Sequence, residues 1–311
     1  MHVGVYKFHC LFESQAVLPE FKGSAIRGGL GHTLKAIACA LRLKSCAECL
    51  LSKNCAYAFI FEAKARHGSS PPTHHAPHRP LPYVLRPPDS TQRSFKPGDD
   101  MSFSLLLFGR GNDYLPYIIY AVKEMGKNGI GRGASTRNAG RFSLDMVKQG
   151  DFILYKGGDF RPVSQPFDLS IEPAPVSHVR EISISCITPV RLKSENRLQN
   201  ELPFHVIIRG ALRRISELEA AYGDGEPALD YKGLVKRAQG VRTAFRYCSW
   251  TDIPRYSSHQ KTPMLIGGLK GKIIYQGEDL EEFLPFLRYC EVVNLGKQTS
   301  FGLGRIQIEW S

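Results

Sequence analysis

The order of strand-like and helix-like segments in the second half of the chain restricts the fold more than any other feature. Residues that alternate between apolar and polar predict strands, and apolar residues three or four positions apart predict helices. The segments are strand 181–193, helix 204–223, strands 241–250 and 263–275, helix 279–290 and strand 305–310, with a further helical stretch at 230–239. This β-α-β-β-α-β order is typical of a ferredoxin-like, or RRM-like, domain.

The first half has a related but less regular pattern. The same criteria predict strand 3–13, helix 24–42, strand 101–109, helix 114–126 and strands 141–149 and 151–156. The order becomes β-α-β-β-α-β if one strand in the irregular middle is hidden. The chain's 311 residues are enough for two domains. We therefore predict an α+β protein of two tandem ferredoxin-like domains, residues 1–170 and 171–311, joined within the proline-rich segment 160–178.

The balance of charge indicates the kind of partner. The chain has 41 lysines and arginines and 29 acidic residues, a net charge of +12, and most of the excess lies in the first 170 residues. A basic surface favours a polyanion such as nucleic acid, although a basic protein with no such partner is an equal alternative at this stage. No apolar run approaches the roughly 20 residues of a membrane span, and the N-terminus does not resemble an export signal. We expect a soluble, cytoplasmic protein with no membrane partner.

The predicted helix 24–42 contains the first candidate for chemistry. Ser24 is a suitable N-cap, and the apolar residues after it form one stripe: Ile26, Leu30, Leu34, Ile37 and Leu41. His32 projects about 200° from the centre of that stripe, on the same side as Gly28 and Lys35. We therefore expect His32 to be exposed, either as a functional group or simply as a solvated side chain.

Three glycines lie inside the same helix, at Gly28, Gly29 and Gly31. Each costs the helix about 1 kcal/mol relative to alanine. This pattern predicts that either a neighbouring helix or a phosphate backbone approaches the helix closely.

Four of the eight cysteines follow this helix with the spacing C-x6-C-x2-C-x5-C: Cys39, Cys46, Cys49 and Cys55. The central C-x2-C pair has the spacing with which two thiolates hold one tetrahedral zinc ion. The outer spacings are looser than in a usual four-cysteine site, so an iron–sulfur cluster and four reduced, unligated thiols are open alternatives. A zinc ion here would be structural, because no set of histidines and carboxylates indicates a catalytic metal with an open coordination position.

The segment NLGKQTSFGLGR, residues 294–305, is the most specific sequence in the chain. It is not a Walker loop, because it leads into a strand and lacks the G-x4-G-K-[ST] order. Its glycines would let the backbone come close to a phosphate, and its basic and hydroxyl side chains would supply donors. These residues are Gly296, Gly302, Gly304, Lys297, Arg305, Thr299 and Ser300. The alternative is that Gly302 and Gly304 only turn the chain into the last strand.

Taken in order, several segments resemble a known family. They are SAIRGGLGHTLKAIAC, the cysteine loop ending in CAYAFIFE, GIGRGASTRNAGRFSL, TPVRLK, LRRIS, RYSSHQKTPMLIGGLKGKI and LGKQTSFGLGR. The set is similar to the CRISPR-associated repeat-processing endoribonucleases of the Cas-six type, which belong to the RAMP superfamily of RNA-binding proteins. The resemblance spans nearly the whole chain. Members of this family have two ferredoxin-like domains and a glycine-rich loop before the final strand.

The resemblance implies that the chain processes precursor crRNA for antiviral defence. A ribose 2′-hydroxyl would attack the adjacent phosphate without a catalytic metal, leaving a 2′,3′-cyclic phosphate and a 5′-hydroxyl. The family commonly places a histidine at or near the first helix, facing the glycine-rich loop of the other domain, and His32 matches that position. Lys35 and Arg27 are candidates for stabilising the phosphorane charge. His259 and Tyr256 are the next candidates for a general base.

The partner that the resemblance implies is CRISPR repeat RNA within precursor crRNA. The residues expected to bind it are Arg209, Arg213, Arg255, Gly296, Lys297, Thr299, Ser300, Gly302, Gly304 and Arg305. The alternative function is a catalytically silent RAMP subunit that binds guide RNA in an interference complex, with other subunits of that complex as partners. An exposed His32 favours the enzyme over this alternative.

Overall fold

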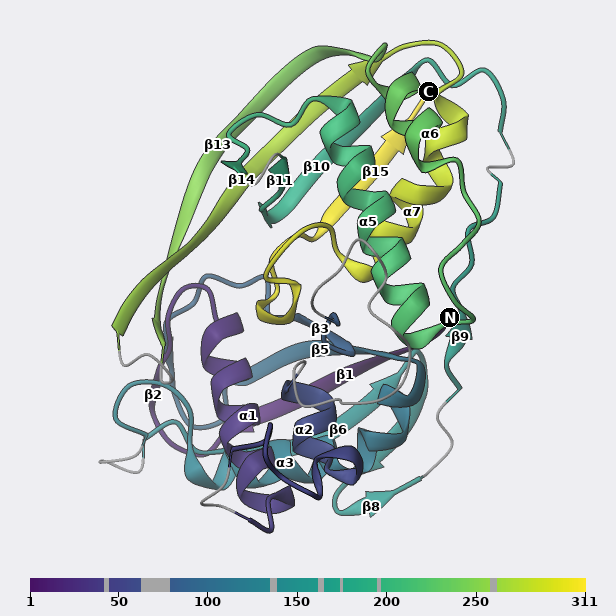
Figure 1. The fold of residues 1–311 in the computed structure, drawn as a ribbon. Coiled ribbons are helices and arrows are strands. Elements are labelled where there is room, and N and C mark those ends of the chain that lie inside the picture. Colours follow the sequence, from purple (N-terminus) through teal and green to yellow (C-terminus); the bar gives the residue numbers. More distant parts are fainter. Residues whose placement is uncertain are drawn as a thin grey trace. The chain divides into compact units, whose positions relative to one another are not determined.

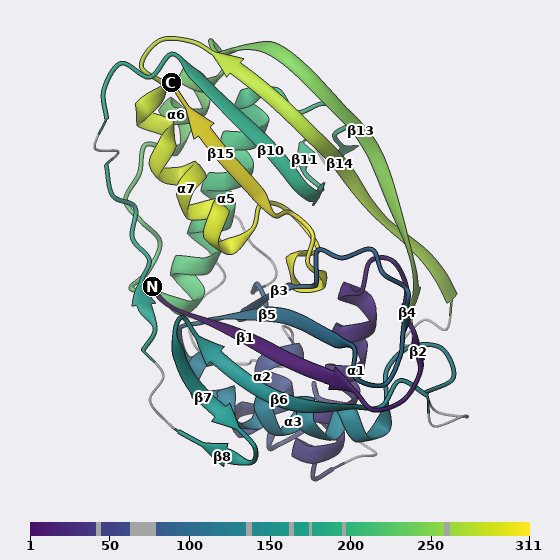
Figure 2. The same ribbon diagram turned by 180° about the vertical axis from the view of Figure 1, so that it is seen from behind.

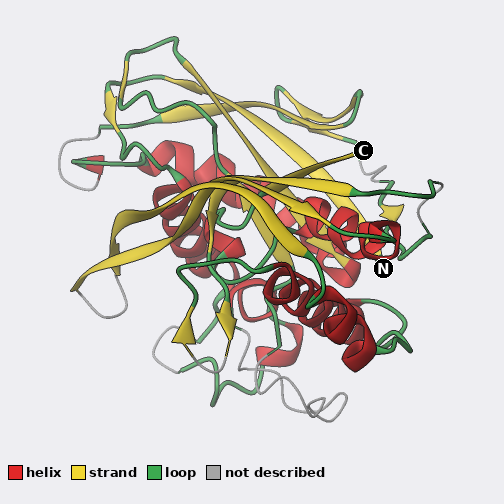
Figure 3. Cartoon of the chain, turned by 90° about the horizontal axis from the view of Figure 1, so that it is seen from above, coloured by secondary structure: helices red, strands yellow, loops and turns green. Residues whose placement is uncertain are grey.

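The computed structural model of the chain describes residues 1–41, 45–62, 79–134, 139–161, 165–173, 176–194, 197–257 and 262–311. It divides into two compact units. The N-terminal unit is His2–Asp168, and the C-terminal unit is Leu169–Ser311 together with Met1. Helices and strands both contribute to the chain (Figure 3). Among the described residues, no helix is long and apolar enough to cross a membrane.

The N-terminal unit is ferredoxin-like. Its main elements are β1 (His2–Phe12), α1 (Gly23–Ala38), β3 (Tyr83–Arg86), β5 (Asp100–Phe108), α3 (Leu115–Asn128) and β6 (Phe142–Gln149). The sheet order β3-β5-β1-β6 continues into β7 (Phe152–Lys156) and β8 (Asp159–Phe160), while β9 (Phe167–Asp168) pairs with β1. The hidden strand that the predicted order required is β3, a short strand of which three residues are buried. The prediction of a β-α-β-β-α-β order is therefore confirmed in this unit.

The sheet of the N-terminal unit is antiparallel and carries its helices on one face (Figures 1 and 2). Alternate residues of β1, including Phe8 and Phe12, are buried and meet aromatic residues of neighbouring strands. A short helix, α2 (Ala56–Phe61), and a small pair of strands, β2 (Ala16–Val17) and β4 (Ser94–Phe95), are additions to the ferredoxin-like pattern.

The ends of α1 differ from the predicted ones. The helix begins at Gly23, its N-cap is Lys22, and the Ser24 hydroxyl makes no hydrogen bond, so the predicted Ser24 cap is wrong. Lys22 is fully buried, and its ammonium donates to the carbonyl oxygens of Ser90 at 2.7 Å and Glu20 at 3.1 Å. These contacts hold the turn before the helix. The helix ends at Ala38, so Leu41, the last residue of the predicted stripe, lies beyond the helix and is exposed.

The C-terminal unit repeats the ferredoxin-like order without a missing strand. Its main elements are β10 (Glu181–Val190), α5 (Phe204–Tyr222), β13 (Arg242–Ser257), β14 (Thr262–Gln276), α7 (Leu284–Val293) and β15 (Ile306–Trp310), with α6 (Tyr231–Ala238) and the pair β11 (Lys193–Ser194) and β12 (Arg197–Leu198) added. The sheet order is β13-β14-β10-β15, and every pairing is antiparallel. Helices α5, α6 and α7 lie on one face of this sheet (Figures 1 and 2). The prediction for this unit is confirmed.

Candidate functional site

His32 lies on the exposed side of α1, as the helical periodicity predicts. Ile26, Leu30 and Leu34 of the same helix are buried, whereas His32 is exposed. Gly28 is one turn before His32 and is also exposed, and a Cβ atom built on it would meet nothing within 4 Å. The imidazole and the backbone beside it are therefore open to a ligand.

Helix packing accounts for the other two glycines of α1. A Cβ atom on Gly29 would lie 2.6 Å from the sulfur of Met125 in α3. A Cβ atom on Gly31 would lie 3.0 Å from the ring of Phe61 in α2. Two neighbouring helices thus approach α1 closely, and this was one of the two expected reasons for the glycines.

Two cations of α1 are held over aromatic rings of α2. The Arg27 guanidinium lies 5.4 Å from the centre of the Phe61 ring, and the Lys35 ammonium lies 5.3 Å from the centre of the Tyr57 ring. The two rings stack on each other with centres 5.7 Å apart. Around the helix axis Lys35 is about 60° from His32 and Arg27 about 140°. The helix therefore places Lys35, but not Arg27, on the His32 side.

The cysteines that follow α1 come together around one cavity of about 200 Å³. Its lining includes Cys39, Cys46, Cys49 and Cys55. Burial raises the pKa of the Cys46 thiol, and the Glu62 carboxylate adds to the rise while the Lys35 ammonium opposes it. Within the described parts of the chain, no three cysteine, histidine, aspartate or glutamate side chains already form a metal site.

In the C-terminal unit, the glycine-rich loop is shaped mainly by its own backbone. Gly302 has φ +99° and Gly304 has φ +79°, and both are buried. A Cβ atom on Gly304 would collide with the carbonyl oxygen of Leu295, and one on Gly296, at φ +86°, would lie 2.6 Å from the carbonyl oxygen of Arg191. At Gly302 and Gly304 the structure thus supports the alternative interpretation, in which glycine turns the chain into β15.

A buried arginine that the sequence analysis missed holds this loop in place. Arg214 of α5 donates from Nη2 to the carbonyl oxygen of Val293 at 3.1 Å and to the Thr299 hydroxyl at 3.2 Å. Thr299 is itself buried, so its hydroxyl belongs to the interior of the loop and not to a surface that could meet phosphate. Burial lowers the pKa of the Arg214 guanidinium. The signal for Arg214 was its spacing from Ile207, Ala211 and Leu218, which lie on the buried face of α5.

Several exposed or half-exposed cations gather beside the loop. The Lys297 side chain is exposed, but its ammonium has lost part of its surrounding solvent. This desolvation and the nearby charges of Lys193 and Arg213 lower the pKa of Lys297. The Arg255 guanidinium of β13 lies 4.4 Å from the centre of the Phe301 ring in the loop. Of the predicted RNA-binding residues, the structure thus brings together Lys297, Arg213 and Arg255.

The other predicted residues are either half-buried or outside the described part of the chain. Ser300 and Arg305 are half-buried in the loop, where the backbone N–H of Arg305 donates to the Thr188 hydroxyl at 2.9 Å. Arg209 is half-buried one turn before Arg213 on α5. His259 and the side chain of Tyr256 lie outside the described residues.

A second surface of the C-terminal unit has the composition of an RNA-binding face. Phe245 and Tyr247 are 52% and 78% exposed on β13, on the sheet face away from α5, and Tyr247 pairs with Lys272 of β14. Lys270, two residues from Lys272, is also exposed and on the same face. Aromatic side chains that stack on bases, with cations beside them, are typical of single-stranded RNA binding by such sheets. Alternating aromatic residues in AFRYCSW were the signal that sequence analysis had missed.

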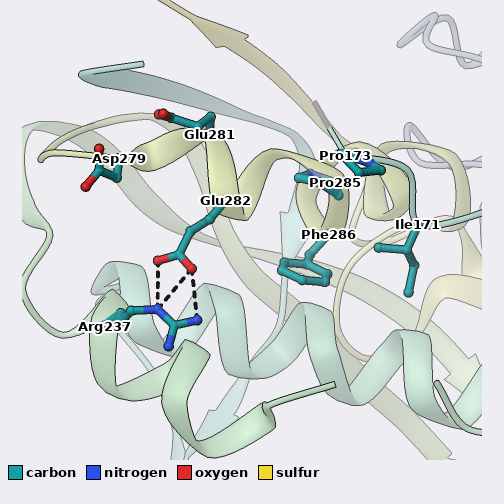
Figure 4. Close-up of a pocket in the computed structure, with 8 residues that line it drawn as sticks. All are labelled: Ile171, Pro173, Arg237, Asp279, Glu281, Glu282, Pro285 and Phe286. Carbon is teal, nitrogen blue, oxygen red and sulfur yellow. Dashed lines mark hydrogen bonds and ion pairs between the residues drawn. The ribbon is translucent and has the colours of Figure 1, made fainter. Parts of the chain in front are cut away.

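One pocket of the C-terminal unit is unsuited to RNA. It has a volume of about 640 Å³, and its lining includes Asp279, Glu281 and Glu282 (Figure 4). Arg237 is the cation in that lining, and its Nε donates to both carboxylate oxygens of Glu282 at 3.0 and 2.9 Å. The charge around this pocket would repel a phosphate backbone.

Comparison with protein families covers both units. A model described as an N-terminal domain matches residues 1–167, and the model of the CRISPR-associated endoribonuclease Cas6 matches residues 184–306. The C-terminal unit thus matches the Cas6 family over residues 184–306. This match agrees with the family resemblance found in the sequence, and the matched family is described as one of CRISPR-associated endoribonucleases.

Individual proteins match nearly the whole chain. An uncharacterised protein of Archaeoglobus fulgidus is 25% identical over 305 residues, covering 96% of this chain and 95% of that protein. The structure of Thermus thermophilus Cas6 matches 99% of this chain and 98% of its own with a TM-score of 0.56 at 13% identity. A Cas6 product complex matches 99% of both chains with a TM-score of 0.58 at 14% identity. At these identities the two structural matches show a common fold.

Proposed function

We propose that this chain binds CRISPR repeat RNA and cleaves precursor crRNA by attack of a ribose 2′-hydroxyl on the adjacent phosphate. The observation that most directly supports this proposal is the exposed His32 on α1, whose neighbouring faces are occupied by the core, α2 and α3. A histidine in that position is held by a rigid helix and is open to solvent. The family model that matches residues 184–306 is that of a CRISPR-associated endoribonuclease, which supports RNA as the substrate.

The reaction needs two proton transfers and no net change in oxidation state. His32 takes the proton of the 2′-hydroxyl, the oxygen forms a bond to phosphorus, and the bond from phosphorus to the 5′-oxygen breaks. The 5′-oxygen takes up a proton from water as it leaves, and His32 returns its proton to solvent, so the products are a 2′,3′-cyclic phosphate and a 5′-hydroxyl. Lys35, at (i, i+3) from His32, stabilises the charge of the phosphorane, while Arg27 keeps α1 packed against α2. No metal ion takes part in these steps.

Two surfaces of the C-terminal unit bind the RNA in this proposal. The cations beside the glycine-rich loop, Lys297, Arg213 and Arg255, contact phosphates and position the strand without reading its bases. On the exposed sheet face, Phe245 and Tyr247 stack on unpaired bases.

Incubation of the purified chain with repeat RNA from its own genome tests the proposal. We expect cleavage at one position in each repeat. His32→Ala should lower the cleavage rate by about 10²–10⁴-fold, because general acid–base catalysis typically contributes a rate factor of that size. The affinity of this variant for RNA should stay within a few fold of the wild type. His2→Ala is the matched control. It removes another exposed histidine of the same unit, which is paired with Asp168 at 2.7 Å, and it should cleave like the wild type.

Two further results decide between mechanisms. Cleavage in excess EDTA should equal cleavage without it, and a requirement for added magnesium would overturn the metal-independent step. Tight repeat binding by wild-type protein that never cuts would instead identify a catalytically silent RAMP subunit.

A further inference from the structure

Four cysteines of the N-terminal unit line one cavity, yet the steps of the proposed reaction do not use them. We propose that Cys39, Cys46, Cys49 and Cys55 bind one structural zinc ion. The proposal is independent of the proposed nuclease activity, because it concerns only how the segment between α1 and α2 is held.

The first argument is that packing alone does not hold this segment. None of residues 45–55, all of which the structure describes, is buried, and Leu50 is 90% exposed. The backbone makes local turns, such as the hydrogen bond from the Ser52 N–H to the Cys49 carbonyl oxygen at 3.0 Å. A segment with no buried residue gains little from the hydrophobic effect, so a metal cross-link is a common means of ordering it.

The second argument is where the four cysteines lie. Cys39 is the C-cap of α1, and Cys55 is the N-cap of α2. Between them, Cys46 and Cys49 occupy one turn, in which the Cys49 N–H donates to the Cys46 carbonyl oxygen at 3.4 Å. A single ion therefore joins the end of one helix, the start of the next and the turn between them, and the cavity of about 200 Å³ has room for it.

Binding closes the cavity around the ion. Zinc–sulfur bonds of about 2.3 Å place tetrahedral sulfurs roughly 3.8 Å apart, and the thiols reach that spacing by moving inward as each loses its proton. The other cavity walls are mostly small and apolar, including Ala38, Ala40 and Ala58.

Elemental analysis of the full-length chain tests the site. We expect about one zinc per chain in protein purified without chelator and then equilibrated with zinc, and loss of that zinc in Cys46→Ser and Cys49→Ser. Cys248→Ser is the matched control, because Cys248 is the remaining half-buried cysteine and lies in the other unit. It should retain the full zinc content.

A second measurement avoids variants that fold poorly. Cobalt(II) added to metal-free wild-type protein should produce the thiolate-to-metal and visible absorption bands of a tetrahedral sulfur site, and added zinc should abolish them. The proposal is overturned if neither zinc nor cobalt binds, if both serine variants keep their zinc, or if the metal present is iron. Fewer than eight free thiols in the denatured, metal-free protein would also overturn it, in favour of a disulfide.

Discussion

Two adjacent arginines of α5 have opposite surroundings. Arg214 is buried and donates to Val293 and Thr299, whereas Arg213 is exposed beside Lys297. Because successive residues of a helix point about 100° apart, one position decides whether a guanidinium supports the fold or faces solvent.

This pair makes a stability prediction. Arg214→Ala leaves the Val293 carbonyl and the Thr299 hydroxyl without their donor, and each buried group without a partner costs about 1–3 kcal/mol of the free energy of unfolding. Arg213→Ala should change that free energy by less than about 0.5 kcal/mol, because it is a surface substitution, but should weaken RNA binding. Urea unfolding followed by circular dichroism, together with repeat-RNA titration, measures both. Equal loss of stability in the two variants would contradict the assigned roles.

At the scale of elements, glycines serve different purposes in α1 and in the glycine-rich loop. Two of the three glycines in α1 let other helices approach, while Gly28 faces open space beside His32. In the loop, Gly304 has a backbone conformation that other residues rarely adopt, and its missing side chain makes room for Leu295.

Alanine substitutions at these two positions should therefore have opposite effects. Gly28→Ala should raise the free energy of unfolding by about 0.5–1 kcal/mol, since it adds helix propensity without a clash. Gly304→Ala should lower it by at least about 1–3 kcal/mol, because a side chain at this φ is strained before the collision with Leu295 is counted. Thermal and urea unfolding of both variants measure the difference, and a stable Gly304→Ala protein would show that the loop can take another path.

At the scale of the whole molecule, the charges that make up the net charge of +12 are not equally placed to bind a polyanion. Lysines beside the glycine-rich loop lie among other cations, whereas the pocket that includes Arg237 and Glu282 is acidic. Binding of a polyanion should therefore depend on where a charge is removed and not on the net charge alone.

Titration with salt shows whether RNA binding depends on the position of a removed charge or only on the net charge. Lys297→Ala should weaken repeat binding and reduce the slope of log K against log salt by about 0.7–0.9, the value for one lost phosphate contact. Lys236→Ala removes the same charge from the exposed side of α6, and its slope should match the wild type. If the two variants shift the slope equally, the loop has no special part in binding.

The sequence alone determined the order of the elements and the exposure of His32. Both follow from local periodicity, because alternating residues share one face of a strand and residues three or four apart share one face of a helix. The same reasoning predicted the ferredoxin-like pattern of the C-terminal unit in full. It also placed four cysteines in one short stretch, although not around one cavity.

Only the tertiary structure decided features that depend on contacts between distant residues. The short strand β3 is too brief to show a period, and its pairing with β5 gives it a place in the sheet. The turn before α1 is held by Lys22, which donates to Ser90, 68 residues away, and the buried Thr299 hydroxyl accepts from Arg214, 85 residues earlier. Such contacts leave no local pattern, because the free energy that selects them comes from burial and hydrogen bonds that exist only after the chain has folded.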